Sequence, residues 1–192
     1  MKPKIKKSKD GIIKILFPEG YSAVIIPSKE SKFAVCVSCQ IGCPVGCTFC
    51  KSGKIKFKRN LTEKEMFNQV KIASEVIKKN PSSVIFMGMG EPTLNLENDL
   101  KAGEKIHDEF KLSQNRITIS TSCLDNLNSL VKCKFNLALS LHSPFNKVRK
   151  KIMPAGCSVR KIVKFANKYI SKANNKKYIM IEYSLMKGIN DS

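Results

Sequence analysis

The most informative chemistry in this chain lies in a short run of cysteines. Cys43, Cys47 and Cys50 follow a C-x3-C-x2-C spacing, in a stretch where glycine and proline favour a loop over a helix. Three closely spaced thiolates can hold one face of a [4Fe–4S] cluster and leave the fourth iron without a protein ligand. The alternative is a structural zinc site, in which Cys39 or Cys36 supplies a fourth ligand. The spacing therefore predicts a metal centre, and both interpretations stay open at this point.

Cysteine usage agrees with metal or redox chemistry. Five of the eight cysteines fall within residues 36–50, and the basic N-terminus, MKPKIKKSKD, leads into no signal-peptide hydrophobic region. A disulfide framework is therefore not expected. No run of about 18 apolar residues occurs, so we expect no membrane span. We interpret the protein as cytoplasmic.

The charge balance is strongly basic. Lys and Arg number 35 against 15 Asp and Glu, for a formal charge of +20. Such a field attracts polyanions, and RNA is the obvious partner. The alternative is compositional: arginine, which specific phosphate contacts favour, occurs only at positions 59, 116, 149 and 160, and heavy Lys, Ile and Asn use is typical of an AT-rich genome. Charge alone favours RNA binding without establishing it.

The hydrophobic pattern predicts alternating strands and helices after a basic tail at residues 1–10. Thr62 and Glu65 form a capping box that begins a helix carrying Met66, Val70 and Ala73 on one face. Strands are expected at 11–17, 22–26, 33–37, 83–87, 116–120, 135–141 and 178–186, and further helices at 96–110, 124–131 and 158–171. Largely unbroken apolar strands between helices indicate a parallel sheet, so the fold class is α/β with about five parallel strands. The strand that leads into the cysteine loop is the first of the five.

Candidate binding residues stand where these strands end. Gly90 and Glu91 follow the strand at 83–87, Ser120 ends the next strand, and Ser140 to His142 closes the one after it. Active sites in parallel sheets lie at the carboxyl ends of the strands. Each residue also has an ordinary interpretation, as a tight turn, a strand-end serine or a structural histidine.

Five segments together resemble the RlmN/Cfr family of radical S-adenosylmethionine (SAM) enzymes. They are CVSCQIGC at 36–43, FMGMGEP at 86–92, ITISTS at 117–122, LSLHSP at 139–144 and IEYSLMKGIND at 181–191. The resemblance runs from about Gly11 to the C-terminus. It implies a partial TIM-like (β/α) barrel over residues 11–192, with a short β extension at 11–35.

The resemblance also implies an activity and a set of site residues. Family members methylate adenine in large-subunit ribosomal RNA, at C2 in RlmN types and at C8 in Cfr types, and RlmN types also act on some tRNAs. A [4Fe–4S] cluster and SAM are the implied cofactors, and a flavodoxin or ferredoxin is the implied reductant. Cys36 would resolve a covalent enzyme–RNA adduct, although a small buried strand residue is its ordinary interpretation. The remaining implied residues are Cys43, Cys47 and Cys50 for the cluster, and Gly90, Glu91, Ser120, Ser140, Leu141 and His142 for SAM.

The sequence departs from the family pattern in ways that bear on methyl transfer. It has no counterpart of most of the family's N-terminal domain, of its last strand, or of the cysteine that accepts the methyl group. We therefore expect the final strand to have an exposed edge. A gene fragment, a second polypeptide that supplies the missing part, or a reduced protein with different chemistry would each account for this. The function hypotheses are an RlmN-type enzyme, a radical SAM protein with another substrate, and a non-enzymatic Fe–S or zinc module that binds RNA.

Overall fold

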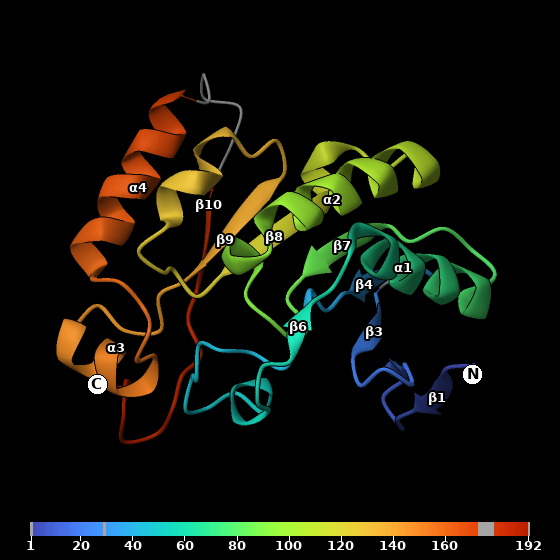
Figure 1. The fold of residues 1–192 in the computed structure, drawn as a ribbon, viewed down its shortest axis with the longest axis horizontal. Coiled ribbons are helices and arrows are strands. Elements are labelled where there is room, and N and C mark those ends of the chain that lie inside the picture. Colours follow the sequence, from blue (N-terminus) through green and yellow to red (C-terminus); the bar gives the residue numbers. More distant parts are fainter. Residues whose placement is uncertain (1, 29, 173–178, 192) are drawn as a thin grey trace.

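The computed structural model describes residues 2–28, 30–172 and 179–191 (Figure 1). Its main feature is an eight-stranded sheet in the order β1-β2-β3-β4-β7-β8-β9-β10. The strands are β1 (Lys4–Lys7), β2 (Ile13–Leu16), β3 (Ser22–Pro27), β4 (Phe33–Cys36), β7 (Ser83–Phe86), β8 (Ile117–Thr121), β9 (Asn136–Ser140) and β10 (Ile179–Glu182). A separate two-stranded ladder joins β5 (Gln40–Ile41) to β6 (Arg59–Asn60).

The parallel half of the sheet confirms the predicted five strands. β4, β7, β8, β9 and β10 pair in parallel, with Val35 opposite Val84 and Ile119 opposite Leu137. The side chains of the central strands β8 and β9 are largely buried because helices cover the sheet, as is typical of βα units. The last predicted strand is observed from Ile179; its first residue, Tyr178, lies outside the described residues.

The free edge expected at the last strand is present in the described part of the chain. β10 pairs with β9 alone there, and Ile181 and Leu185 are exposed. At the opposite edge the prediction of a tail was wrong. Lys4–Lys7 forms β1, which pairs antiparallel with β2 while all four of its side chains stay exposed.

Helices α1 (Glu63–Ile77), α2 (Leu96–Phe110) and α4 (Val159–Lys172) form an arc along one side of the sheet (Figure 1). The capping box at the start of α1 is confirmed: Thr62 accepts from the Glu65 amide, and the Glu65 side chain accepts from the Thr62 amide. On α4, Ile162, Phe165 and Tyr169 are buried, whereas Ile170 is 39% exposed. None of the helices in the described ranges is long and apolar enough to cross a membrane.

One local prediction was wrong, and one short helix was not predicted. The segment expected as a helix at 124–131 forms instead a 3-10 helix, η4 (Leu127–Lys132), whose Leu127 and Leu130 are buried. A short helix, α3 (Asn146–Ile152), was not predicted, because its sequence NKVRKKI has no broad apolar stripe. Three further 3-10 turns are η1 (Ser52–Lys54), η2 (Pro92–Leu94) and η3 (Gln114–Arg116).

Candidate functional site

A cavity of about 500 Å³ lies at the carboxyl ends of the parallel strands. Its size is typical of a small-molecule site. The cysteine loop forms one side, and the ends of β7, β8, β9 and β10 form the other. Eight of the ten predicted site residues line it: Cys43, Cys47, Cys50, Gly90, Glu91, Ser120, Ser140 and His142. Cys36 and Leu141 do not.

The three thiols of the loop face this cavity together. Burial raises the pKa of Cys43, and it raises that of Cys47 to about 11, with the neighbouring thiols adding to the increase. The loop is anchored on both sides. The Cys43 amide donates to the Ile55 carbonyl at 3.2 Å, and the Thr48 amide donates to the carbonyl of Ile152 at the end of α3 at 2.9 Å. Three thiols are thus held in one place although the loop is irregular.

The two cysteines considered as a fourth zinc ligand lie elsewhere. Cys39 is fully buried, and a Cβ built on Gly90 would lie 2.6 Å from its sulfur, so it packs behind the Gly90 backbone. Cys36 lies in β4 opposite Ile85. Within the described ranges, no group of three or more His, Cys, Asp and Glu side chains has the arrangement that holds a metal ion.

Glu91 is buried, yet its carboxylate is well supplied with donors. Its Oε1 accepts from the Thr93 amide at 3.1 Å, the Thr93 hydroxyl at 2.8 Å and the Thr121 hydroxyl at 2.6 Å. Its Oε2 accepts from the Ser122 amide at 2.7 Å. These bonds fix the carboxylate at the cavity wall. Each carboxylate oxygen has two lone pairs, and among the described residues Oε2 has only one donor. One lone pair of Oε2 is therefore left for a ligand.

Gly90 is required by close approach as well as by conformation. Its φ is +117°, and a side chain there would also lie 2.8 Å from Gln40. Gln40 in turn accepts from the Glu91 amide at 2.9 Å and donates to Asn60 at 2.8 Å. The turn that carries Gly90 and Glu91 is therefore fixed to β5, the short strand directly before the cysteine loop.

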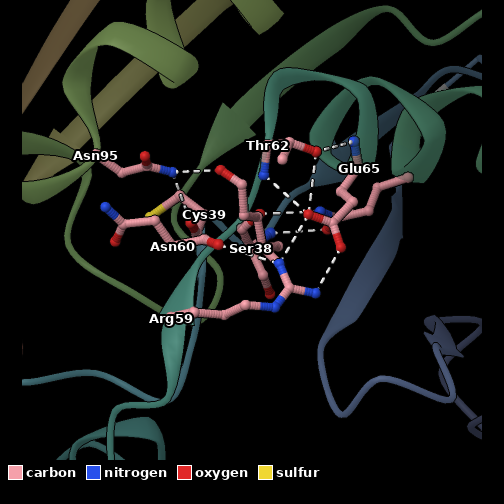
Figure 2. A network of polar contacts seen from close by, with 9 residues as sticks. Ser38, Cys39, Arg59, Asn60, Thr62, Glu65 and Asn95 are labelled. Atoms are coloured by element: carbon pink, nitrogen blue, oxygen red, sulfur yellow. Dashed lines mark hydrogen bonds and ion pairs between the residues drawn. The ribbon is translucent and has the colours of Figure 1, made fainter.

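A network of polar contacts also fixes the backbone around β5 and β6 (Figure 2). Asn95 donates to the Cys39 carbonyl at 2.9 Å and to the Leu61 carbonyl at 2.8 Å. Arg59 forms a two-bond ion pair with Glu65, with distances of 2.7 and 2.9 Å, and this pair lowers the pKa of Glu65 to about 2. The start of α1 and the segment before the cysteine loop are thereby joined.

Glu182 is a cavity residue that sequence reasoning missed. Its Oε2 accepts from the Ser120 hydroxyl at 2.9 Å and from the Ser140 hydroxyl at 3.0 Å. One carboxylate thus orients both predicted serines from the neighbouring strand ends. The signal was present in the sequence, because an acidic residue inside an otherwise apolar strand needs a polar partner.

His142 is fixed by its backbone and by its ring. Its φ is +53°, its Nδ1 accepts from the Ser184 amide at 3.0 Å, and its carbonyl accepts from Asn190 at 2.6 Å. Burial lowers the pKa of His142, so the ring is neutral at pH 7 with its proton on Nε2. The Phe49 ring meets it edge-on at 4.9 Å, which brings the cysteine loop against this wall.

Arg149 on α3 is the second residue that sequence reasoning missed. It is 1% exposed, and its guanidinium donates to four backbone carbonyls. Two of these belong to Ser140 and Leu141 at the end of β9, one to Ser122 after β8, and one to Cys157. Leu141 therefore contributes to the site through its backbone. Because α3 also holds Thr48, one short helix connects the cysteine loop to the opposite wall.

Comparison with known proteins gives this arrangement a family. The model of the radical SAM superfamily matches residues 37–192, which is most of the chain and includes every residue that lines the cavity. The protein belongs to the radical SAM superfamily.

Its similar relatives are more specific. It is 33% identical to a probable dual-specificity RNA methyltransferase RlmN of Prochlorococcus marinus, over 95% of this chain and 56% of the relative. It is 38% identical to the RlmN of Buchnera aphidicola, over 97% of this chain and 55% of the relative. The chain therefore spans about half the length of these curated relatives.

A solved structure shows the same fold. A radical SAM methyltransferase from Sphaerobacter thermophilus superposes with a TM-score of 0.88 at 32% identity, covering 99% of this chain and 60% of that one. Both the parallel strands and the antiparallel extension at residues 4–27 thus fall within the matched region.

Proposed function

We propose that this protein binds a [4Fe–4S] cluster through Cys43, Cys47 and Cys50, and SAM in the adjoining cavity. The observation that carries the proposal is that these three thiols share one cavity with Glu91, two serines and His142. The donor set fits a cluster with one open iron, since the two other nearby cysteines lie outside the cavity. When bound, the cluster supplies the electron that cleaves SAM.

The wall residues have distinct tasks in this proposal. Glu91 directs the open lone pair of Oε2 at the ammonium group of SAM, and the Gly90 turn, packed against Cys39 and Gln40, holds Glu91 in that position. Ser120, Ser140 and Glu182 form a polar group suited to the sugar hydroxyls. The neutral imidazole of His142 offers an Nε2–H donor on the same wall.

We further propose that the reaction is RlmN-type methylation of adenine C2 in large-subunit ribosomal RNA, and also in tRNA. The names of the similar relatives support RNA methylation as the class of reaction, and the proposal includes a cytoplasmic location. A flavodoxin or ferredoxin is the reductant in this scheme. In this scheme Cys36 acts as a thiolate, which removes a proton from the enzyme–RNA adduct and then attacks the neighbouring sulfur, so that a disulfide forms and the RNA is released. Burial raises the pKa of Cys36 to about 11, so this thiol is protonated at neutral pH in the free protein.

The methyl-carrying cysteine has no assigned place among the residues described. We place it on a segment that pairs with the free edge of β10, supplied by a continuation of this chain or by a second polypeptide. The exposed Ile181 and Leu185 give such a segment an apolar surface to cover.

The test compares ribosomal RNA and tRNA from cells with and without the gene by nucleoside mass spectrometry. The proposal predicts that 2-methyladenosine falls when the gene is deleted and returns with the wild-type gene but not with Cys36→Ala. Unchanged 2-methyladenosine in both RNAs would contradict the methylation proposal. SAM cleavage by the purified protein would then identify a radical SAM enzyme with another substrate.

A further inference from the structure

We propose that the mouth of the cavity is a binding surface for single-stranded or looped RNA. This proposal rests on the proposed function, and the surface is the one that presents an adenine to the cavity. We call this surface the basic rim. It consists of seven lysines on the cysteine loop and on α3: Lys51, Lys54, Lys56, Lys58, Lys147, Lys150 and Lys151, all of which are exposed.

The two segments of the basic rim lie side by side at the cavity (Figure 1). Ser52 and Gly53 from the loop and Met153 from the end of α3 all line it. The Thr48–Ile152 hydrogen bond joins the segments, and Val45, Cys47, Ile152 and Met153 form one buried apolar cluster beneath them. The lysines of the basic rim therefore lie on two adjacent segments that border the cavity.

Acidic and basic residues are separated along the sequence, and the basic rim lies in stretches without acidic residues. No Asp or Glu occurs at 31–62 or at 126–181, the two stretches that contain the basic rim, whereas nine of the fifteen acidic residues fall within 63–109. Among the described residues, no carboxylate lies within 4 Å of a basic-rim lysine. A uniform compositional bias would not separate the charges in this way. The separation favours a directed field that attracts a polyanion.

Two exposed aromatic side chains lie next to these lysines in the sequence. Phe57 is 39% exposed between Lys56 and Lys58, and Phe145 is 63% exposed at the start of α3. The backbone of Phe57 is fixed beside the start of the cysteine loop, because the Lys58 amide donates to the Ile41 carbonyl at 2.8 Å and Gly42 packs against the Phe57 backbone. Phosphates alone need no exposed rings, whereas unpaired bases stack on them. The combination therefore fits RNA with unstacked bases better than a duplex or an acidic protein.

The test measures binding of a fluorescent single-stranded RNA by the cluster-loaded protein across a salt series. Each phosphate contact contributes about 0.7 to the slope of log K against log salt for single strands, so K147Q/K150Q/K151Q should reduce that slope by about 2. The matched control is K64Q/K71Q/K105Q on α1 and α2, which removes the same charge from the acidic part of the sequence and should leave the slope within about 0.5 of wild type.

The rings are tested separately. F57A and F145A, each made alone, should weaken binding about 5- to 150-fold with an unchanged salt slope, because stacking carries no charge. A duplex of the same sequence should lose much less affinity. Equal losses for single strand and duplex would overturn the role of the rings.

Formation of 5′-deoxyadenosine without RNA should stay at the wild-type level in both sets of variants, since none of these residues lines the cavity. A slope that changes equally in the control variant, or tighter binding to phosphatidylserine vesicles than to RNA, would overturn the proposed surface. RNA binding through the rim by a protein that does not cleave SAM would support the surface and contradict the proposed function. SAM cleavage without RNA binding would do the reverse.

Discussion

Replacement of Arg149 by Met tests how the site is held together. The guanidinium is buried and donates at 2.6 to 2.9 Å to the carbonyls of Ser140, Leu141, Ser122 and Cys157. Met fills a similar volume but donates nothing. Arg149→Lys keeps the charge but cannot reach all four carbonyls from one ammonium group.

The expected loss follows from these contacts. A hydrogen bond from a charged group contributes about 1.5–3 kcal/mol, and the burial of the guanidinium opposes part of the sum. Water from the cavity can replace the donor at Ser122 and Ser140, which line it, but not readily at the other two carbonyls. We therefore expect Arg149→Met to lower the free energy of unfolding by about 3–5 kcal/mol, and Arg149→Lys by about half as much.

Urea unfolding gives the stability, and titration with S-adenosylhomocysteine gives the binding, which should weaken at least about tenfold because the ends of β8 and β9 are released. Arg160→Met is the matched control, since Arg160 is exposed on α4, and it should change stability by no more than about 0.5 kcal/mol. An Arg149→Met protein within about 1 kcal/mol of wild type that binds normally would refute the reasoning.

Three further predictions concern single residues. Gly90→Ala should abolish S-adenosylhomocysteine binding and cost about 2–4 kcal/mol of stability because its Cβ has no room, whereas Gly188→Ala, with a positive φ but open space, should cost only about 1 kcal/mol by urea unfolding. Beside Arg59 the folded-state pKa of Glu65 is about 2, below its ordinary value of 4.5, so the stabilisation by this carboxylate is present above pH 4.5 and is lost as the pH falls toward 2. Over that window the free energy of unfolding of wild type should fall by about 2 kcal/mol more than that of Glu65→Gln in thermal unfolding scans. Parallel curves for the two proteins would contradict the assignment. Glu182→Gln should weaken S-adenosylhomocysteine binding about tenfold by calorimetry without a change in unfolding midpoint larger than a few degrees, while equal affinity would remove Glu182 from the site.

The parallel half of the fold could be predicted because its signals are local. The apolar strand at 135–141 is largely buried on both faces, the strand at 83–87 buries Val84 and Phe86, and α1 has both a capping box and an apolar stripe. The strand at Lys4–Lys7 was not predicted because its four exposed side chains show no strand pattern, and its conformation depends on pairing with β2. Helix α3 was not predicted for a related reason, because it depends on the tertiary contacts of the buried Arg149 and Ile152.

The candidate site was predictable as a set of residue types at strand ends, but not as a connected structure. The cysteine spacing and the strand-end residues meet at one cavity, as expected from parallel topology. The contacts that fix them are long-range. Arg149 is one basic residue in a lysine-rich stretch, and no sequence pattern distinguishes a buried arginine from an exposed one. The same holds for Gln40, whose partners Asn60 and Glu91 are distant in sequence.

Cluster and SAM binding are tested most directly by anaerobic reconstitution with iron and sulfide, followed by reduction in the presence of SAM. We expect the absorption of a [4Fe–4S] cluster and the formation of 5′-deoxyadenosine, and the loss of both when Cys43, Cys47 and Cys50 are replaced by Ala. Cys133→Ala, a buried cysteine that does not line the cavity, is the matched control and should retain both signals. Cluster absorption or 5′-deoxyadenosine that survives in the triple variant would contradict the central claim.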